Sequence, residues 1–209
     1  MTVAELGRVM HEMAMLLPAH KTLKSLPSGD GHPIIVIPGF SADNRTTAIL
    51  RHYLKRWGYA AEPWELDQNI DPRAIGGFED VITFKENMTE RVGERIRELH
   101  ESTGKRVTLI GWSLGGIFSR VLASENQASV KHVITLGTPF GDPRTVPIYA
   151  FMERWHKKPM TVSHLDAWLA MCNAPLGDVK LSIMFSKSDG FVSSTIAHNA
   201  KGDLQEAVH

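Results

Sequence analysis

Short apolar runs recur along the chain and predict buried strands. Residues Ile34–Ile37 are continuously apolar and lie between Pro33 and Pro38, which is typical of a parallel strand covered on both faces. Similar runs, separated by polar segments that carry glycine, predict further strands. The expected strands are 34–37, 59–66, 107–110, 130–136 and 181–185, although Pro63 weakens the case for the second.

Between these runs, apolar residues recur at helical spacing. One stripe over 49–57 ends at Gly58, and another over 88–99 ends near Gly104. A third helix follows residue 113, a stripe from Val3 to Leu17 predicts an N-terminal helix docked on the domain, and 67–84 is expected to be loop. This alternation predicts one α/β domain over 1–209, with a mostly parallel sheet flanked by helices.

Residues 141–178 interrupt the alternation with two short amphipathic pieces, around Ile148–Trp155 and Leu165–Met171. They are either ordinary crossover helices or a small apolar cap inserted over the functional site. Periodicity does not distinguish a face that packs on the core from one that lines a pocket, so both interpretations stay open.

Composition excludes several classes of function. The 209 residues carry 23 Lys plus Arg and 23 Asp plus Glu, so the net charge gives no reason to expect a nucleic-acid partner. The single cysteine, Cys172, rules out an intrachain disulfide, and its apolar surroundings favour a buried side chain. Charged residues interrupt the N-terminal stripe and no run reaches transmembrane length, so we expect neither a signal peptide nor an integral membrane segment, and a cytoplasmic location.

The most informative motif is Gly111-Trp112-Ser113-Leu114-Gly115, which lies between an apolar strand and a helical stripe. It reads G-x-S-x-G, the pattern of a sharp strand-to-helix turn that exposes a serine hydroxyl at a helix N-terminus. Such a turn strains the serine backbone and needs glycine on either side, and the helix end favours developing negative charge. The simpler alternative is a tight turn in which Ser113 caps the helix.

A serine nucleophile needs a base, an acid that orients the base, and two oxyanion donors. Asp189 follows the strand at 181–185 within a polar turn and is the preferred acid, with Asp142 as second choice. The expected donors are the backbone N–H groups of Leu114, directly after the serine, and of Phe40, in the turn after the first strand.

The histidine base is the least defined member of this group. Only His198 and His209 follow Asp189 in the chain; His198 lies nine residues later and His209 is the last residue. His164 precedes Asp189, in the segment that could form a cap. Each of the three also fits an ordinary surface histidine. Neither paired Cys/His spacing nor H-E-x-x-H occurs, so no metal or other cofactor is expected.

Four stretches in this order resemble the α/β-hydrolase superfamily, in particular its small bacterial lipase- or esterase-like members. They are 34–40, 110–116, 133–139 and 186–192. The resemblance implies a minimal α/β-hydrolase core with an N-terminal helix in place of two leading strands. It implies Ser113 as nucleophile, Asp189 as acid, Phe40 and Leu114 as oxyanion donors, and Thr138-Pro139 at the floor of the site. It also leads us to expect that the chain ends just short of the family's histidine, with His209 itself as a second option.

These observations predict a serine hydrolase that cleaves carboxylic esters through an acyl-enzyme on Ser113. Aromatic residues near the motif, Phe40, Trp112 and Phe140, favour a small apolar ester or acyl substrate. Two alternatives remain open. An acyltransferase uses the same acyl-enzyme with another acceptor, and an inactive hydrolase fold serves as a binding protein.

Overall fold

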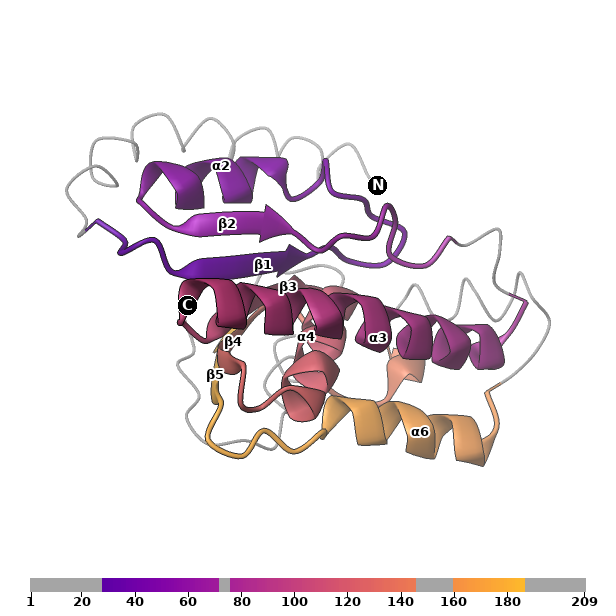
Figure 1. Cartoon of the computed structure of the whole chain (residues 1–209). Coiled ribbons are helices and arrows are strands. Elements are labelled where there is room, and N and C mark those ends of the chain that lie inside the picture. The colour runs from indigo at the N-terminus through magenta and orange to yellow at the C-terminus, as the bar shows by residue number, and fades with distance from the viewer. Residues whose placement is uncertain (1–27, 72–75, 146–159, 187–209) are drawn as a thin grey trace, which may run out of the picture.

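Five parallel strands form a single sheet in the computed structural model, which describes residues 28–71, 76–145 and 160–186 (Figure 1). They are β1 (Pro33–Ile37), β2 (Ala60–Pro63), β3 (Val107–Trp112), β4 (Val130–Leu136) and β5 (Lys180–Met184). Each expected strand is present within a few residues of its predicted bounds. The predicted α/β class with a parallel sheet is therefore confirmed.

The order of the strands is β2-β1-β3-β4-β5. The chain leaves β1 toward one edge of the sheet and later returns to build β3, β4 and β5 on the other side of β1. The connections therefore diverge between β1 and β3, and the carboxyl ends of two such neighbouring strands are the usual place for a ligand site in sheets of this kind. Register pairs Ile37, the last residue of β1, with Gly111, two residues before Ser113.

In the described ranges the strands are accompanied by the helices α2 (Ala48–Arg56), α3 (Phe78–Thr103), α4 (Leu114–Glu125) and α6 (Val162–Cys172), with a short 3-10 turn, η1 (Pro143–Thr145). Helix α3 ends as predicted at Gly104, whose φ of 65° is left-handed. Its start differs from the expected loop over 67–84. The Asp80 carboxylate accepts the backbone N–H groups of Gly76 and Gly77 (2.6 and 3.0 Å), so it caps a helix that already begins at Phe78.

Side chains alternate between the two faces of the sheet, and each face packs on different helices. Ile35, Ile37 and Leu109 belong to the large core cluster with α3, α4 and α6, whereas Ile34 and Val36 pack with Leu54 of α2 in a smaller cluster. Figure 1 likewise shows α2 beside β2, away from α3, α4 and α6. Helix α4 is buried from Leu114 to Ala123, which makes the β3–α4 unit the centre of the fold.

The structure describes part of the inserted region, residues 141–145 and 160–178. Trp168, Met171 and Cys172 of α6 are buried in the large core cluster, so this second piece is a crossover helix between β4 and β5. The first piece and the expected N-terminal helix lie outside the described residues. Within the described part, no helix combines the length and apolarity needed to span a membrane.

Candidate active site

The backbone of Ser113 has φ 53° and ψ −123°, directly between the end of β3 and the first residue of α4. A positive φ at a residue other than glycine is uncommon, and this combination is one that only glycine adopts without strain. The strain turns the chain sharply, so that β3 continues at once into a helix. The strand-to-helix turn predicted from G-x-S-x-G is therefore present.

Two glycines make this turn sterically feasible. A Cβ on Gly111 would collide with the Gly115 carbonyl and the Ser119 hydroxyl. A Cβ on Gly115 would collide with the carbonyl oxygens of Ile37 and Pro38, at the end of β1. Side chains at either position would push α4 away from the sheet. The motif thus encodes the close approach of α4 to β1.

Hydrogen bonds hold both backbone groups of Ser113. Its N–H donates to the Leu136 carbonyl at 2.9 Å, and its carbonyl accepts the Gly116 N–H at 2.9 Å and the Thr138 hydroxyl at 3.0 Å. The Ser113 hydroxyl makes no capping bond to α4 and is half-buried rather than sealed. Because that hydroxyl is not used as a cap, the simpler interpretation of the motif as a serine N-cap does not hold.

Gly39 brings the turn after β1 against Ser113. A Cβ built on Gly39 would lie 3.2 Å from the Ser113 Cβ and 3.3 Å from Cε3 of Trp112, so a side chain here would require these neighbours to move by a few tenths of an ångström. The Gly39 carbonyl accepts the Ala42 N–H at 3.0 Å and closes a β-turn over residues 39–42. In a trans peptide the C=O and N–H groups point in opposite directions, so the N–H of Phe40 points out of that turn.

The two expected oxyanion donors thus lie in the turn beside Ser113 and at the first residue of α4. Leu114 is the first residue of α4, where backbone N–H groups have no partner within the helix. Among the described residues, no acceptor receives a hydrogen bond from the N–H of Phe40 or of Leu114. Both N–H groups are therefore available for an external oxygen atom.

The structure describes only some of the residues predicted as the acid or the base. Asp189, His198 and His209 lie outside the described residues. Asp142 lies in the loop after β4, where the hydrogen bonds from Arg144 lower the pKa of its carboxyl group. Since Arg144 Nε lies 2.9 and 3.0 Å from its two oxygens, Asp142 is already committed to a local partner.

His164 lies near the start of α6 and contacts the start of α3. Its Nε2 is 2.9 Å from Oε1 of Glu79, and its ring stacks on Phe78 with centroids 5.0 Å apart. Through these contacts, His164 joins the start of α6 to the start of α3. No cluster of three or more His, Cys, Asp or Glu side chains suited to a metal ion occurs in the described ranges.

The chain was compared with protein-family models, with curated protein sequences and with solved structures. A family model described as the alpha/beta hydrolase fold matches residues 82–167, which include the strand-to-helix turn at Ser113. The chain has the α/β-hydrolase fold. The predicted resemblance to that superfamily, with its minimal core, is thereby confirmed. No curated protein sequence matches the chain.

Solved structures agree on the fold at low sequence identity. The chain is similar to a structure from work on LipS and LipT, two metagenome-derived lipolytic enzymes, with a TM-score of 0.60, 16% identity and coverage of 87% of this chain and 84% of that one. It is similar to a polyneuridine aldehyde esterase variant (TM-score 0.54, 14% identity, 85% and 90% covered). Alpha/beta hydrolase domain-containing protein 10 from mouse is a third (TM-score 0.52, 14% identity, 88% and 81% covered).

Sequence reasoning missed the residues that hold the turn after β1. Asn69 is fully buried beneath that turn, yet it lies 31 positions from Pro38, whose carbonyl it contacts. A long-range contact of this kind leaves no periodic signal. The one available sign was a polar pair, Gln68-Asn69, at the end of the segment that follows β2.

Proposed function

We propose that this protein is a serine hydrolase that cleaves carboxylic esters through an acyl-enzyme at Ser113. The observation that carries the proposal is the strained Ser113 backbone, which presents an uncapped hydroxyl at the N-terminus of α4. The hydrolase fold and the lipolytic and esterase neighbours support the same class of reaction. The turn at Gly39, in contact with Ser113, supports it independently.

In the proposed reaction, Ser113 Oγ attacks the acyl carbonyl carbon while a histidine takes the hydroxyl proton. The carbonyl oxygen becomes an oxyanion and accepts hydrogen bonds from the N–H groups of Phe40 and Leu114. Collapse of this intermediate expels the alcohol, which receives the proton from the histidine. Water then repeats the sequence on the acyl-enzyme, releases the acid and restores the Ser113 hydroxyl.

Asp189 is the proposed acid that orients the histidine, and His209 and His198 are the candidates for that base within this chain. The positive end of the α4 dipole adds to oxyanion stabilisation, because Ser113 immediately precedes the helix. The buried backbone of α4 holds this dipole in place, so the developing charge meets donors that need no rearrangement.

An apolar ester is the proposed substrate, because an aromatic side chain lies beside the nucleophile. Trp112 is 46% exposed even though it directly precedes Ser113, and its ring edge lies against Gly39. Phe40 is half-buried next to it, whereas Phe140, which we expected at the site, is buried in the core at 1% exposure. Trp112 is therefore the aromatic surface that an acyl or alcohol group would cover.

Labelling by a fluorophosphonate probe tests the proposal, combined with hydrolysis of p-nitrophenyl butyrate. The parent protein should label and hydrolyse the ester, and Ser113→Ala should do neither. Ser102→Ala is the matched control, since Ser102 is an exposed serine near the end of α3 whose hydroxyl donates to the Glu98 carbonyl. It should behave as the parent does. Absence of labelling in both the parent and Ser113→Ala would contradict the proposal.

Two further measurements refine the assignment. His198→Ala and His209→Ala identify the base, because loss of the true base should abolish labelling as fully as loss of Ser113. Product analysis with and without an added alcohol separates hydrolysis from acyl transfer. Ester formation that outruns release of free acid in water would replace the hydrolase assignment by an acyltransferase.

A further inference from the structure

The turn over residues 39–42 is strained and does not hold itself. Ser41 has a φ of 60°, a left-handed value in a position where β-turns of this kind prefer glycine or asparagine. A residue in such a conformation persists only where its surroundings over-determine it. The single internal hydrogen bond, from Ala42 N–H to the Gly39 carbonyl, is not enough to do this.

The support comes from the segment Gln68–Ile70, which follows β2. The Ser41 N–H donates to the Asn69 carbonyl at 2.7 Å, and Gln68 Nε2 donates to the Ser41 carbonyl at 2.9 Å. The Asn69 N–H donates in turn to the Ala42 carbonyl at 2.9 Å. Both backbone groups of the strained residue are thus bound by the neighbouring loop, which acts as a clamp on the turn.

The side chain of Asn69 extends the clamp to the residue before the turn. Its Nδ2 donates to the Pro38 carbonyl at 2.6 Å, and the residue is completely buried. Pro38 lies at the point where β1 meets α4, since a Cβ on Gly115 would collide with this same carbonyl oxygen. Asn69 therefore fixes the peptide plane that leads into Gly39 and Phe40.

Two features of the clamp are unfavourable for stability alone. Asn69 Oδ1 is buried without a hydrogen-bond partner in the described part of the chain, and an unsatisfied buried oxygen is destabilising. The next residue, Ile70, is β-branched and buried, yet it has a φ of 51°. Strain and unsatisfied polar groups concentrate at functional sites, where geometry has priority over stability.

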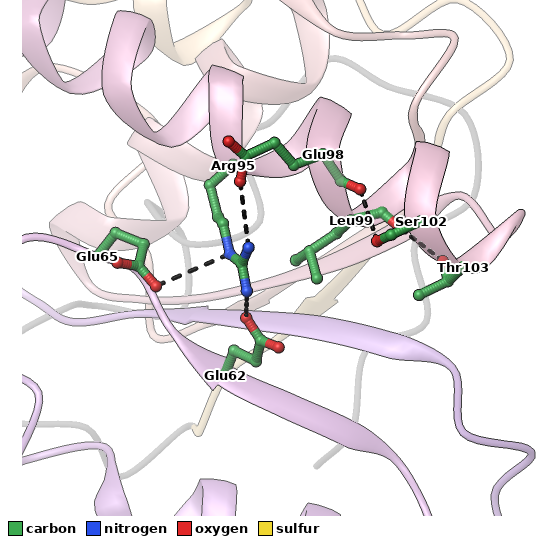
Figure 2. A network of polar contacts seen from close by, with 7 residues as sticks. All are labelled: Glu62, Glu65, Arg95, Glu98, Leu99, Ser102 and Thr103. Atoms are coloured by element: carbon green, nitrogen blue, oxygen red, sulfur yellow. Dashed lines mark hydrogen bonds and ion pairs between the residues drawn. The ribbon is translucent and has the colours of Figure 1, made fainter.

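The base of the clamp is anchored to α3. Figure 2 shows the Arg95 guanidinium between Glu62 of β2, Glu65 of the following loop and Glu98 of α3, with N–O distances of 2.6, 3.8 and 3.2 Å. Glu65 lies only four residues before Asn69. The clamp therefore joins the turn after β1 to a 26-residue helix rather than to a free loop.

We propose that Asn69 is a positioning residue of the oxyanion hole, which acts through the Pro38 carbonyl to hold the Phe40 N–H toward the substrate. This inference rests on the function proposed above. It assigns Asn69 an effect on the transition state, where the oxyanion exists, and little effect on binding of the neutral ester. Asn69 itself does not touch the substrate.

The test compares Asn69→Ala with Asn44→Ala in the full chain. Asn44 is a close match, because its Nδ2 also donates to a backbone carbonyl across the same two loops, to Leu66 at 2.9 Å, and its Oδ1 is likewise buried without a partner among the described residues. Removing one oxyanion donor outright lowers kcat by about 100- to 1,000-fold. In Asn69→Ala the Phe40 N–H should be held less firmly, so we expect kcat to fall by about 10- to 100-fold and KM to change by less than about threefold. In Asn44→Ala we expect both kcat and KM to stay within about threefold of the parent values.

A conservative variant separates positioning from simple destabilisation. In Asn69→Asp, a protonated carboxyl donates to the Pro38 carbonyl as the amide did, whereas a carboxylate repels it, and burial raises the pKa of such a carboxyl. The ratio of kcat in Asn69→Asp to kcat in the parent should therefore rise, by about tenfold, as the pH falls from about 8 to 6. A ratio independent of pH, or equal kcat losses in Asn69→Ala and Asn44→Ala, would overturn the proposal while leaving the hydrolase assignment intact.

A structural measurement keeps the inference testable if the parent hydrolyses no ester, which would refute the proposed function. Amide hydrogen exchange of residues 39–42 should then be faster in Asn69→Ala than in Asn44→Ala, because only the former releases the turn. Equal exchange in the two variants would refute the clamp itself.

Discussion

The strain at Ser113 makes an unusual prediction, namely that removing the side chain should stabilise the protein. Most substitutions to glycine destabilise a folded protein, because glycine loses more backbone entropy on folding than other residues do. At Ser113, however, φ is 53° and ψ is −123°, a conformation that glycine adopts freely and that costs other residues about 1–3 kcal/mol. Ser113→Gly should relieve this strain.

The magnitude follows from the difference between these two effects. Relief of about 2 kcal/mol, reduced by an entropic loss of about 0.5–1 kcal/mol for glycine, leaves Ser113→Gly about 1 kcal/mol more stable than Ser113→Ala. Alanine is the proper reference, since it also lacks the hydroxyl but keeps the Cβ that creates the strain. For a chain of this size, 1 kcal/mol corresponds to an increase in Tm of about 2–4 °C.

Thermal unfolding followed by circular dichroism measures the difference, with Ser124 as the control position. Ser124 lies near the end of α4, where Ser124→Gly should be about 1 kcal/mol less stable than Ser124→Ala. The glycine-minus-alanine difference should thus change sign between the two ends of one helix. If Ser113→Gly unfolds below Ser113→Ala, as at position 124, then the backbone at Ser113 is not strained and our account of the turn is wrong.

Three further predictions concern the core and the titratable groups. Phe118→Ala should lose about 3–5 kcal/mol and lower the Tm by about 10 °C in a thermal melt, because Phe118 is fully buried in α4 against Phe84. Burial lowers the pKa of His32 below its usual value, so the unfolded chain binds more protons and stability should fall as the pH drops through about 6.5. In chemical-denaturation measurements, His32→Gln should flatten this dependence of stability on pH. An unchanged slope in the variant would refute the prediction. The Cys172 thiol is buried and its pKa is raised to about 12. The reagent 5,5′-dithiobis(2-nitrobenzoic acid) should therefore leave the native protein unmodified and react with Cys172 once urea unfolds the chain. Rapid reaction of the native protein would contradict the burial of this thiol.

Much of the fold was predictable because its signals are local. Continuous apolar runs mark strands that are buried on both faces, and β4 has the predicted bounds, Val130–Leu136. The start of α3 was missed because its cap depends on the Asp80 side chain, which bonds backbone groups upstream, at a point where the apolar stripe is weak. Local pattern also left the role of 141–178 open, and only packing assigned α6 to the core.

In the candidate site, too, local features were predictable from the sequence and long-range contacts were not. Ser113 and Leu114 were predictable, because one short motif encodes both the strain and the glycines that permit it. The Phe40 turn was predictable as a turn, but not its contact with Ser113, which depends on β1 and β3 being neighbours in the sheet. The contact of Asn69 with the Pro38 carbonyl was not predictable, since it joins residues 31 positions apart in the chain. The predictions for Asp189, His198 and His209 remain predictions.

These observations assign different physical tasks to the two halves of the site. The proposed nucleophile, Ser113, lies in a densely bonded part of the fold, where Leu136, Gly116 and Thr138 bind both of its backbone groups and α4 is buried along most of its length. The proposed oxyanion donor, Phe40, lies instead on a short loop, whose strained conformation depends on a second loop. A substitution in the core should therefore lower stability with little effect on oxyanion geometry, whereas a substitution in the clamp should do the reverse. Measuring both the Tm and kcat of Phe118→Ala and of Asn69→Ala tests this separation directly.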